Sequence, residues 1–345
     1  MKKILILRFS AMGDVAMLVP VVNSLALQHP EVEISVLTRK HLTPLFDWTP
    51  SNVHAIGIDL KAYDGIKGLN RLYKELKKQR FDAVADVHDV LRTKYLRWRF
   101  KLSFKKTVCI DKGRKDKKQL LGNGVNARPL AEMTTRYAKV FDRLGLQVDL
   151  QPETGFTTTG EDFSSLYKLY GEKQSDDVWI GIAPFAAHTG KIYPLDKMRK
   201  VVEELSSKEM RIFLFGAGKA ENEVLQSWTS GDCIVNTCGQ LGGLHNEMLL
   251  MSMLDAMLAM DSANMHIASI VGIPVFSVWG ATHPKAGFTP WRQPADNFIQ
   301  LDDLACRPCS IFGKKPCQFG DFRCMNLIDP ATIINKLLQI KEENL

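Results

Sequence analysis

Short apolar runs alternate with amphipathic stretches along almost the whole chain, and this alternation limits the fold more than any other feature. Short apolar runs are typical of buried strands, and amphipathic stretches with helical spacing are typical of helices that cover a sheet. Strands that alternate with helices predict a parallel sheet with helices on both faces. We therefore expect an α/β protein.

The alternation occurs twice, with a polar, turn-rich stretch at 149–177 between the two series, which predicts a linker with a short helix. Strands are predicted at 3–9, 33–38, 53–58, 83–87, 178–184, 211–215, 256–260 and 275–280. Helices are predicted at 15–28, 65–79, 128–145, 195–206, 220–228, 246–253 and 330–342. The 345 residues suffice for two domains with separate cores. We expect an N-terminal domain at 1–160, a C-terminal domain at 161–329 and a cleft between them, with 330–345 packing back across the boundary.

The formal net charge of +7 is unevenly distributed. Residues 1–160 contain 28 Lys and Arg against 16 Asp and Glu, and 92–118 contain 12 basic and 2 acidic residues. Such a block is typical of a solvated helix face, or of a surface that binds an anionic substrate, a membrane or nucleic acid. Trp98, Phe100 and Phe104 among the cations favour anionic lipid headgroups. No nucleic-acid partner is expected, because no known nucleic-acid-binding signature accompanies the charge.

Neither a targeting segment nor a membrane span is predicted. Arg8 and Asp14 interrupt the first apolar run, and no stretch of about 18 uncharged apolar residues occurs. The protein is therefore expected to remain in the cytoplasm.

An acid, a hydroxyl and an imidazole lie within six residues at Asp261, Ser262 and His266, where an apolar run turns into a helix. Polar groups at the carboxyl end of a buried strand lie where open α/β sheets bind ligands, and a helix that begins there offers N–H groups to a phosphate. This pattern predicts a nucleotide-diphosphate site. A capping Asp and a satisfied buried His are the structural alternatives.

The turn after the first predicted strand contains Ser10, Ala11 and Gly13, small residues that permit close approach between strand and helix. A single Gly does not make the dinucleotide-binding fingerprint. Asp14 follows at the start of a helix, where it either complements the helix dipole or acts as a base that deprotonates a hydroxyl.

Three blocks in order resemble glycosyltransferase family 9, the bacterial heptosyltransferases. They are Arg8–Val15 with Pro20, Thr189–Leu195 after Ala183-Pro184, and Asp261–Ala268 with the Gly272–Val275 and 280–284 segments. The resemblance extends over residues 3 to 329. It implies the GT-B architecture, in which two Rossmann-like domains with parallel sheets face a central cleft. It also implies inverting, metal-independent and cofactor-free transfer of heptose from ADP-heptose to the inner core of lipopolysaccharide.

The resemblance assigns roles residue by residue. Asp14 matches the family's general base. The sugar-donor side comprises Thr189, Lys191, Glu221, Asp261, Ser262 and His266. The acceptor side comprises Ser10, Arg92, Lys94 and Arg97. Lys191 as a surface lysine and Glu221 as a solvent-facing helix acid are the structural alternatives. Ile192-Tyr193 stands where the family more often has Arg-Trp, which leaves the sugar donor open.

The expected partners are ADP-heptose and a lipid-linked anionic saccharide acceptor. The protein is expected to be a monomer that contacts the cytoplasmic side of the inner membrane peripherally. The alternatives are another nucleotide sugar or acceptor, a nucleotide-sugar epimerase on the same fold, and a non-catalytic membrane-surface protein that uses the 92–118 block.

Seven cysteines in a cytosolic chain are expected to be reduced. Cys306, Cys309, Cys317 and Cys324 are spaced almost as in zinc sites. A metal-free thiol loop is the alternative, and no metal ligand is assigned.

Overall fold

The computed structural model describes residues 1–343 and divides the chain into two compact units. Unit 1 comprises residues 1–112 and 131–157, and unit 2 comprises residues 113–130 and the chain from 158 onward. The predicted division near 160 lies close to this one, but 113–130 packs with unit 2. The reason is apolar packing, because Leu120 and Ala127 form a small core with Ala286 and Ile311.

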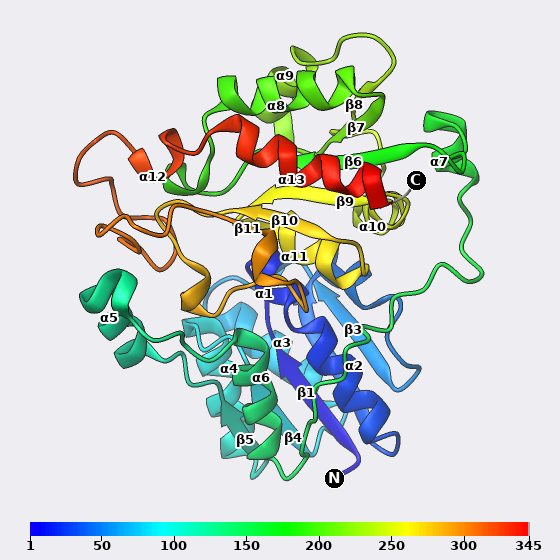
Figure 1. Cartoon of the computed structure of the whole chain (residues 1–345). Helices are drawn as coiled ribbons and strands as arrows, with labels where there is room; N and C mark the ends of the chain where they lie inside the picture. Colours follow the sequence, from blue (N-terminus) through cyan, green and yellow to red (C-terminus); the bar gives the residue numbers. More distant parts are fainter. Residues whose placement is uncertain (344–345) are drawn as a thin grey trace. The chain divides into compact units, whose positions relative to one another are not determined.

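Unit 1 contains a five-stranded parallel sheet in the order β3-β2-β1-β4-β5 (Figure 1). The strands are β1 (Lys3–Leu7), β2 (Glu33–Arg39), β3 (Val53–Ile58), β4 (Ala83–Asp86) and β5 (Lys106–Cys109). The order reverses between β1 and β4, and ligands of open α/β sheets bind at such a switch point, outside the carboxyl ends of the strands.

Helices cover both faces of this sheet. They are α1 (Met12–Ala16), α2 (Val19–Gln28), α3 (Gly65–Lys77), α4 (Leu91–Leu102) and α6 (Met133–Asp142), with short 3₁₀ helices η1 (Lys40–Phe46) and η2 (Leu60–Tyr63). Leu5 and Leu7 share a core with Leu72 of α3 and Leu96 of α4. Because side chains alternate along a strand, the other β1 residues face the opposite side, where α2 and α6 pack together.

The predicted helix 15–28 is two helices, and Pro20 explains the break. Pro20 lies in the first turn of α2, where a missing N–H costs nothing because that turn has no internal acceptor for it. The two helices let the chain turn directly after β1, which places Asp14 at the carboxyl edge of the sheet.

Unit 2 contains a six-stranded parallel sheet in the order β11-β10-β9-β6-β7-β8. The strands are β6 (Val178–Ala183), β7 (Met210–Leu214), β8 (Ile234–Asn236), β9 (Ala256–Met260), β10 (Val275–Val278) and β11 (Phe298–Ile299). Its switch point lies between β6 and β9.

The helices of unit 2 include the C-terminal one. They are α5 (Arg114–Asn123), α7 (Ser164–Tyr170), α8 (Leu195–Ser207), α9 (Gly218–Gln226), α10 (Leu244–Ser252), α11 (Ala263–Ile270), α12 (Arg323–Asn326) and α13 (Pro330–Glu343). Four 3₁₀ helices complete it: η3 (Gly124–Asn126), η4 (Thr189–Lys191), η5 (Pro284–Ala286) and η6 (Ala295–Asn297).

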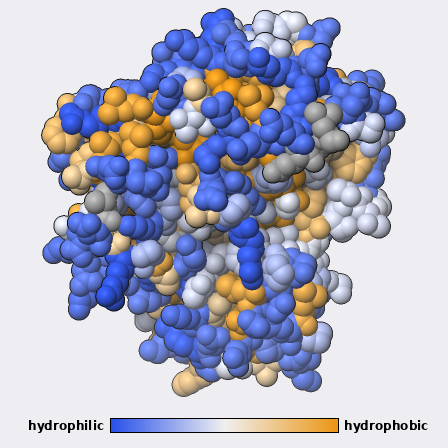
Figure 2. All heavy atoms as spheres, viewed as in Figure 1, coloured by the Kyte–Doolittle hydropathy of each residue, from blue (hydrophilic) through white to orange (hydrophobic). Residues whose placement is uncertain are grey.

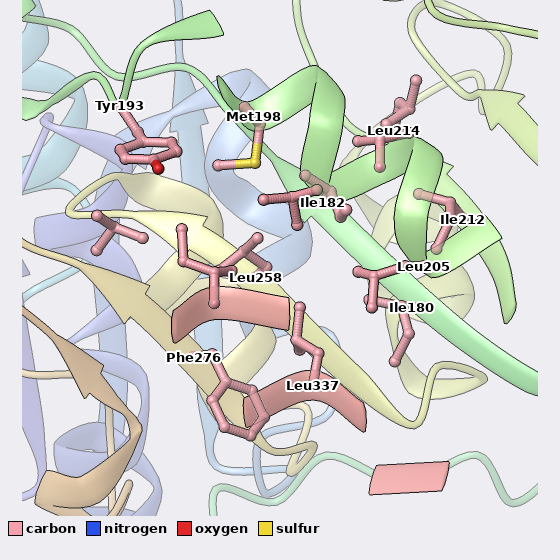
Figure 3. Packing of buried hydrophobic residues seen from close by; sticks show 14 of the residues in the cluster. Ile180, Ile182, Tyr193, Met198, Leu205, Ile212, Leu214, Leu258, Phe276 and Leu337 are labelled. Carbon is pink, nitrogen blue, oxygen red and sulfur yellow. The ribbon is translucent and has the colours of Figure 1, made fainter. Parts of the chain in front are cut away.

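Helices α8 and α13 pack together on one face of the unit 2 sheet. Leu205 of α8 and Leu337 of α13 lie in one core with strand residues such as Ile180, Leu258 and Phe276 (Figure 3). Each buried Leu contributes about 2 kcal/mol of transfer free energy. The apolar face of α13 therefore packs in the core of unit 2.

The first half of the predicted linker is part of unit 1. Gln151 donates its backbone N–H to Ser24 Oγ at 3.1 Å, and Asn23 Nδ2 donates to the carbonyl of Glu153 at 3.1 Å. Gly155 has φ of +84°, and a Cβ there would lie 2.6 Å from the Trp48 carbonyl oxygen. Only Gly fits this close approach.

Hydrophilic residues predominate on the face that Figure 2 shows, interrupted by hydrophobic areas. Within residues 1–343 no helix is long and apolar enough to cross a membrane.

Candidate active site

Arg8, Asp14 and His88 follow β1 and β4 at the switch point of unit 1. Leu7 of β1 lies opposite Asp86 of β4, so the two segments leave the sheet side by side. Arg8 NH2 lies 2.7 Å from Asp14 Oδ2, and Arg8 NH1 donates to the Val87 carbonyl at 2.6 Å. The buried guanidinium therefore ties the helix after β1 to the loop after β4.

One oxygen of Asp14 is held and the other is available. Oδ2 accepts from Arg8 and from the backbone N–H of Ala11 at 3.2 Å, while the Tyr137 hydroxyl donates to the Asp14 carbonyl at 3.2 Å. Oδ1 has no hydrogen-bond partner among the residues that the structure describes, and the side chain is 26% exposed. A carboxylate fixed at one oxygen and open at the other suits a general base.

His88 is neutral beside this pair. Burial and the positive charge of Arg8 lower its pKa to about 3. Nδ1 accepts the backbone N–H of Phe9 at 3.3 Å, so the ring proton is on Nε2. The site thus contains a fixed hydrogen-bond donor as well as a carboxylate.

The three predicted acceptor cations each have a carboxylate partner. Arg92 pairs with Asp64 at 2.9 Å, and Arg92 holds the pKa of that carboxyl below its usual value. Lys94 lies 3.7 Å from Asp89. An anionic acceptor would have to compete with these carboxylates.

Arg97 has a structural role of its own. It lies 2.9 Å from the fully buried Asp86, which also accepts the backbone N–H groups of His88 at 3.1 Å and Asp89 at 2.7 Å. Burial nevertheless raises the pKa of Asp86. Arg97 therefore helps to shape the loop that carries His88. Ser10 lies half-buried in the turn after β1.

Lys191 and Asp261 meet at the switch point of unit 2. Lys191 Nζ lies 2.8 Å from Asp261 Oδ2, and Thr282 Oγ1 donates to the same oxygen at 2.8 Å. Ala183 of β6 lies opposite Ala259 of β9, which explains why the segments after these strands come together.

Gly190 and Gly280 allow the loops after β6 and β10 to approach each other closely. The Gly190 carbonyl accepts the backbone N–H of Ala281 at 2.9 Å, and a Cβ on Gly280 would lie 2.8 Å from the same carbonyl oxygen and 2.7 Å from Met325. The two loops touch through their backbones, so Lys191 reaches Asp261.

Ser262 occupies the N-cap position of α11 at this edge without a side-chain capping hydrogen bond, and its Oγ is buried without a hydrogen-bond partner in residues 1–343. The first N–H groups of the helix have no partner inside the helix. A buried hydroxyl and helix N–H groups next to a lysine form a site that suits a phosphate.

The other predicted sugar-donor residues are placed differently. His266 is buried one turn further along α11, and Thr189 is exposed at the start of η4. Glu221 Oε2 accepts the backbone N–H of Ala217 at 2.8 Å, so it caps the turn after β7, one strand away from Lys191.

Arg307 is a site residue that the sequence does not reveal. It is fully buried and donates to the carbonyl oxygens of Trp279 at 3.1 Å, Gly280 at 2.6 Å and Thr282 at 3.0 Å. Burial lowers its pKa. Arg307 thus holds the loop that carries Thr282. No periodicity or motif marks it, whereas His88 could have been found from its position two residues after a buried strand.

The four clustered cysteines line one cavity of about 10 Å³. All are free thiols, and within residues 1–343 no three His, Cys, Asp or Glu side chains are placed so that they could hold a metal ion. Burial raises the pKa of Cys324 to about 11. Burial acts in the same direction on Cys317, but backbone N–H groups of residues 319–322 outweigh it and lower that pKa.

Two doubly wound units with polar side chains at the carboxyl edges form the GT-B architecture of nucleotide-sugar-dependent glycosyltransferases. The sequence profile of glycosyltransferase family 9 (heptosyltransferase) matches residues 69–319, and the chain belongs to this family. The match begins after the Asp14 block, so that block is not part of it.

Relatives and solved structures agree with this membership. The chain is similar to lipopolysaccharide heptosyltransferase 3 of Escherichia coli K12, with 23% identity over 84% of each chain. In fold it resembles the E. coli ADP-heptose lps heptosyltransferase II (TM-score 0.73, 19% identity, 99% of both chains). It also resembles a family 9 glycosyl transferase of Veillonella parvula (TM-score 0.77, 19% identity, 99% of this chain and 98% of that one).

Proposed function

We propose that the protein transfers heptose from ADP-heptose to the inner core of lipopolysaccharide, with inversion at the anomeric carbon. Membership of family 9 supports transfer of heptose, and the similarity to a lipopolysaccharide heptosyltransferase and to an ADP-heptose lps heptosyltransferase supports these substrates. The observation that carries the proposal is the half-free carboxylate of Asp14 in unit 1, together with the lysine and helix N-terminus that suit a phosphate in unit 2.

On the acceptor side, Asp14 Oδ1 takes the proton of the acceptor hydroxyl while that oxygen attacks the sugar C1. Arg8 and the Ala11 N–H hold Oδ2 and so fix the direction of Oδ1. His88 donates from Nε2 and orients the acceptor. Ser10, Arg92, Lys94 and Arg97 contact its anionic groups.

On the sugar-donor side, the leaving diphosphate needs positive charge or N–H donors. Lys191, Thr189, Ser262 and the first N–H groups of α11 supply them, which is why we propose a reaction without a metal ion or cofactor. When the diphosphate binds Lys191, it displaces Asp261 from its ion pair with this lysine. Asp261 then accepts a hydrogen bond from a hydroxyl of the sugar. Glu221 binds the ribose hydroxyls and His266 lines the same side.

We further propose that the protein is a cytoplasmic monomer that contacts the inner membrane peripherally, because its acceptor is attached to a lipid. A membrane-bound acceptor requires the enzyme to come to the bilayer surface.

Asp14→Asn tests the proposed base. We expect transfer to fall about 10²–10⁴-fold, because the amide cannot take the proton. ADP binding, measured by calorimetry, should stay unchanged, since Asp14 belongs to unit 1 and the phosphate contacts to unit 2. The control is Asp142→Asn, another Asp of unit 1. Full transfer activity in Asp14→Asn would falsify the assignment.

A panel of nucleotide sugars tests the substrate. Binding and turnover should be greatest with ADP-heptose. Preference for another nucleotide sugar would show that ADP-heptose is not the sugar donor. An altered free sugar formed without acceptor would indicate an epimerase. No thermal stabilisation by any nucleotide would favour a non-catalytic protein.

A further inference from the structure

Unit 1 leaves three large apolar side chains in solvent at the end of α4. Trp98 is 54% exposed, Leu102 58% and Phe104 99%. Trp98 and Leu102 are four residues apart and therefore lie on one face of the helix. Phe104 follows in the turn that ends the helix.

The backbone holds Phe104 outward. Its N–H donates to the Lys101 carbonyl at 3.0 Å, and the next N–H, of Lys105, donates to the Phe100 carbonyl at 3.2 Å. Phe104 has φ of +58°, in the left-handed region where Gly or Asn would be less strained. A phenylalanine at this position is not explained by the turn or by packing within unit 1.

Cations lie next to Leu102 and Phe104. A surface cavity of about 360 Å³ at the ends of α3 and α4 is lined by Lys77, Arg80 and Lys105 and by the apolar Leu102 and Phe104. Its volume is in the range of small-molecule sites. In the described part of the chain, none of Lys77, Arg80, Lys101 and Lys105 forms an ion pair with a carboxylate.

We propose that this surface docks on an anionic lipid bilayer. The α3–α4 surface is Lys77, Arg80, Trp98, Lys101, Leu102, Phe104 and Lys105. Cations at helix C-termini are common because they complement the dipole, but this does not explain the exposed Trp, Leu and Phe. Apolar side chains among unpaired cations match a lipid headgroup layer, with the rings among the acyl chains and the cations at the phosphates.

The surface is separate from the candidate active site. Arg80 precedes β4 and Lys105 precedes β5, so the surface lies at the amino edge of the unit 1 sheet, beside the packed helices α3 and α4 (Figure 1). Asp14 and His88 lie at the carboxyl edge, about 15 Å away by the length of a five-residue strand. The docked protein thus keeps this edge clear of the bilayer, at a distance that a lipid-linked saccharide bridges. This reading rests on the proposed lipid-linked acceptor.

Vesicle flotation with the full-length protein tests the docking. We expect binding to vesicles of phosphatidylglycerol and phosphatidylcholine, and much weaker binding to phosphatidylcholine alone. The double variant Trp98→Ala/Phe104→Ala should bind at least about tenfold more weakly. The triple variant Lys77→Ala/Arg80→Ala/Lys105→Ala should lose about fivefold for each cation removed.

Matched variants on unit 2 control for lost apolar area and lost charge. Phe319→Ala/Leu327→Ala removes side chains that are 53% and 64% exposed. Lys168→Ala/Lys200→Ala/Lys314→Ala removes three exposed cations. Both should bind vesicles like the unchanged protein, and circular dichroism and melting temperature confirm folding of every variant.

Two acceptors separate docking from catalysis. Transfer to an acceptor without acyl chains should be unchanged in the Trp98→Ala/Phe104→Ala variant, while transfer to an acceptor in anionic vesicles should fall. Equal binding to both kinds of vesicle, or unchanged binding of both surface variants, overturns the proposal. If the protein binds anionic vesicles through this surface but transfers to neither acceptor, docking stands and the proposed transfer fails.

Discussion

At the scale of single residues, the hydrogen bonds of Asp14 suit both of the roles between which the sequence leaves the choice open. It accepts the Ala11 N–H at the start of α1, as a helix-capping acid does, and it keeps Oδ1 available as a base must. The buried Arg8 makes both possible, because it fixes one oxygen only.

His88 and His283 should make stability depend on pH below neutrality. Burial is the main cause that lowers their pKa values to about 3 and about 4, whereas an unfolded His titrates near 6.5. The folded protein keeps both rings neutral, so the two rings make their full contribution to the free energy of unfolding above pH 6.5. As the pH falls from 6.5 towards 4, protonation of the unfolded chain should reduce the free energy of unfolding by up to about 1.4 kcal/mol per pH unit for each ring.

Urea denaturation between pH 7 and 4 measures this slope. His88→Gln should remove the contribution of one ring and flatten the curve. His41→Gln, at an exposed position, should leave it unchanged. An identical slope in His88→Gln and the unchanged protein would mean that His88 is protonated in the folded state.

At the scale of elements, the loops after the strands form the site, and buried side chains hold these loops. Arg307 donates to three carbonyls of the loop after β10, and Thr282 of that loop contacts Asp261. The Cys-rich segment therefore supports the proposed sugar-donor side of unit 2 through Arg307, and Cys309 Sγ also donates to the Ala281 carbonyl of this loop at 3.7 Å.

Arg307→Met should lower the free energy of unfolding by at least about 3 kcal/mol, because several buried carbonyls lose their donors. ADP binding should weaken as well, since Ala281 of the same loop donates to the Gly190 carbonyl and would no longer hold the segment that carries Lys191 in place. Urea denaturation and calorimetry measure the two effects. Arg128→Met, at an exposed position in unit 2, should change stability by less than about 0.5 kcal/mol. A similarly small change in Arg307→Met would contradict the supporting role.

At the scale of the whole molecule, each unit has a hydrophobic core of its own. Leu337 of α13 is fully buried in unit 2, and Leu96 of α4 is fully buried in unit 1. Chains with two cores commonly unfold in more than one step.

Leu337→Ala and Leu96→Ala should each cost about 2–5 kcal/mol but lower different calorimetric transitions. ADP should raise only the transition that Leu337→Ala lowers, because the proposed phosphate contacts lie in unit 2. A single transition that both variants shift equally would show that the two units unfold as one.

The local pattern predicts the elements well where each element is long and periodic. The strands that precede Asp14 and Asp261 were expected at the positions where β1 and β9 lie. Helices α4 and α5 and strands β5, β8 and β11 were not predicted, and neither were the packing of 113–130 with unit 2 and the helix break before Pro20. The strands are too short to show a period, α4 and α5 are rich in cations and lack a clear apolar stripe, and the packing of 113–130 depends on distant residues.

The sequence by itself determined the α/β alternation, the two series and the polar residues after the strands, because hydrophobic periodicity and strand-end chemistry are local. Only the tertiary structure decided which of these residues meet. It paired Arg8 with Asp14, Lys191 with Asp261 and the predicted acceptor cations with carboxylates. Strand order brings Lys191 and Asp261 together although they are far apart in the chain, and no local pattern records that order.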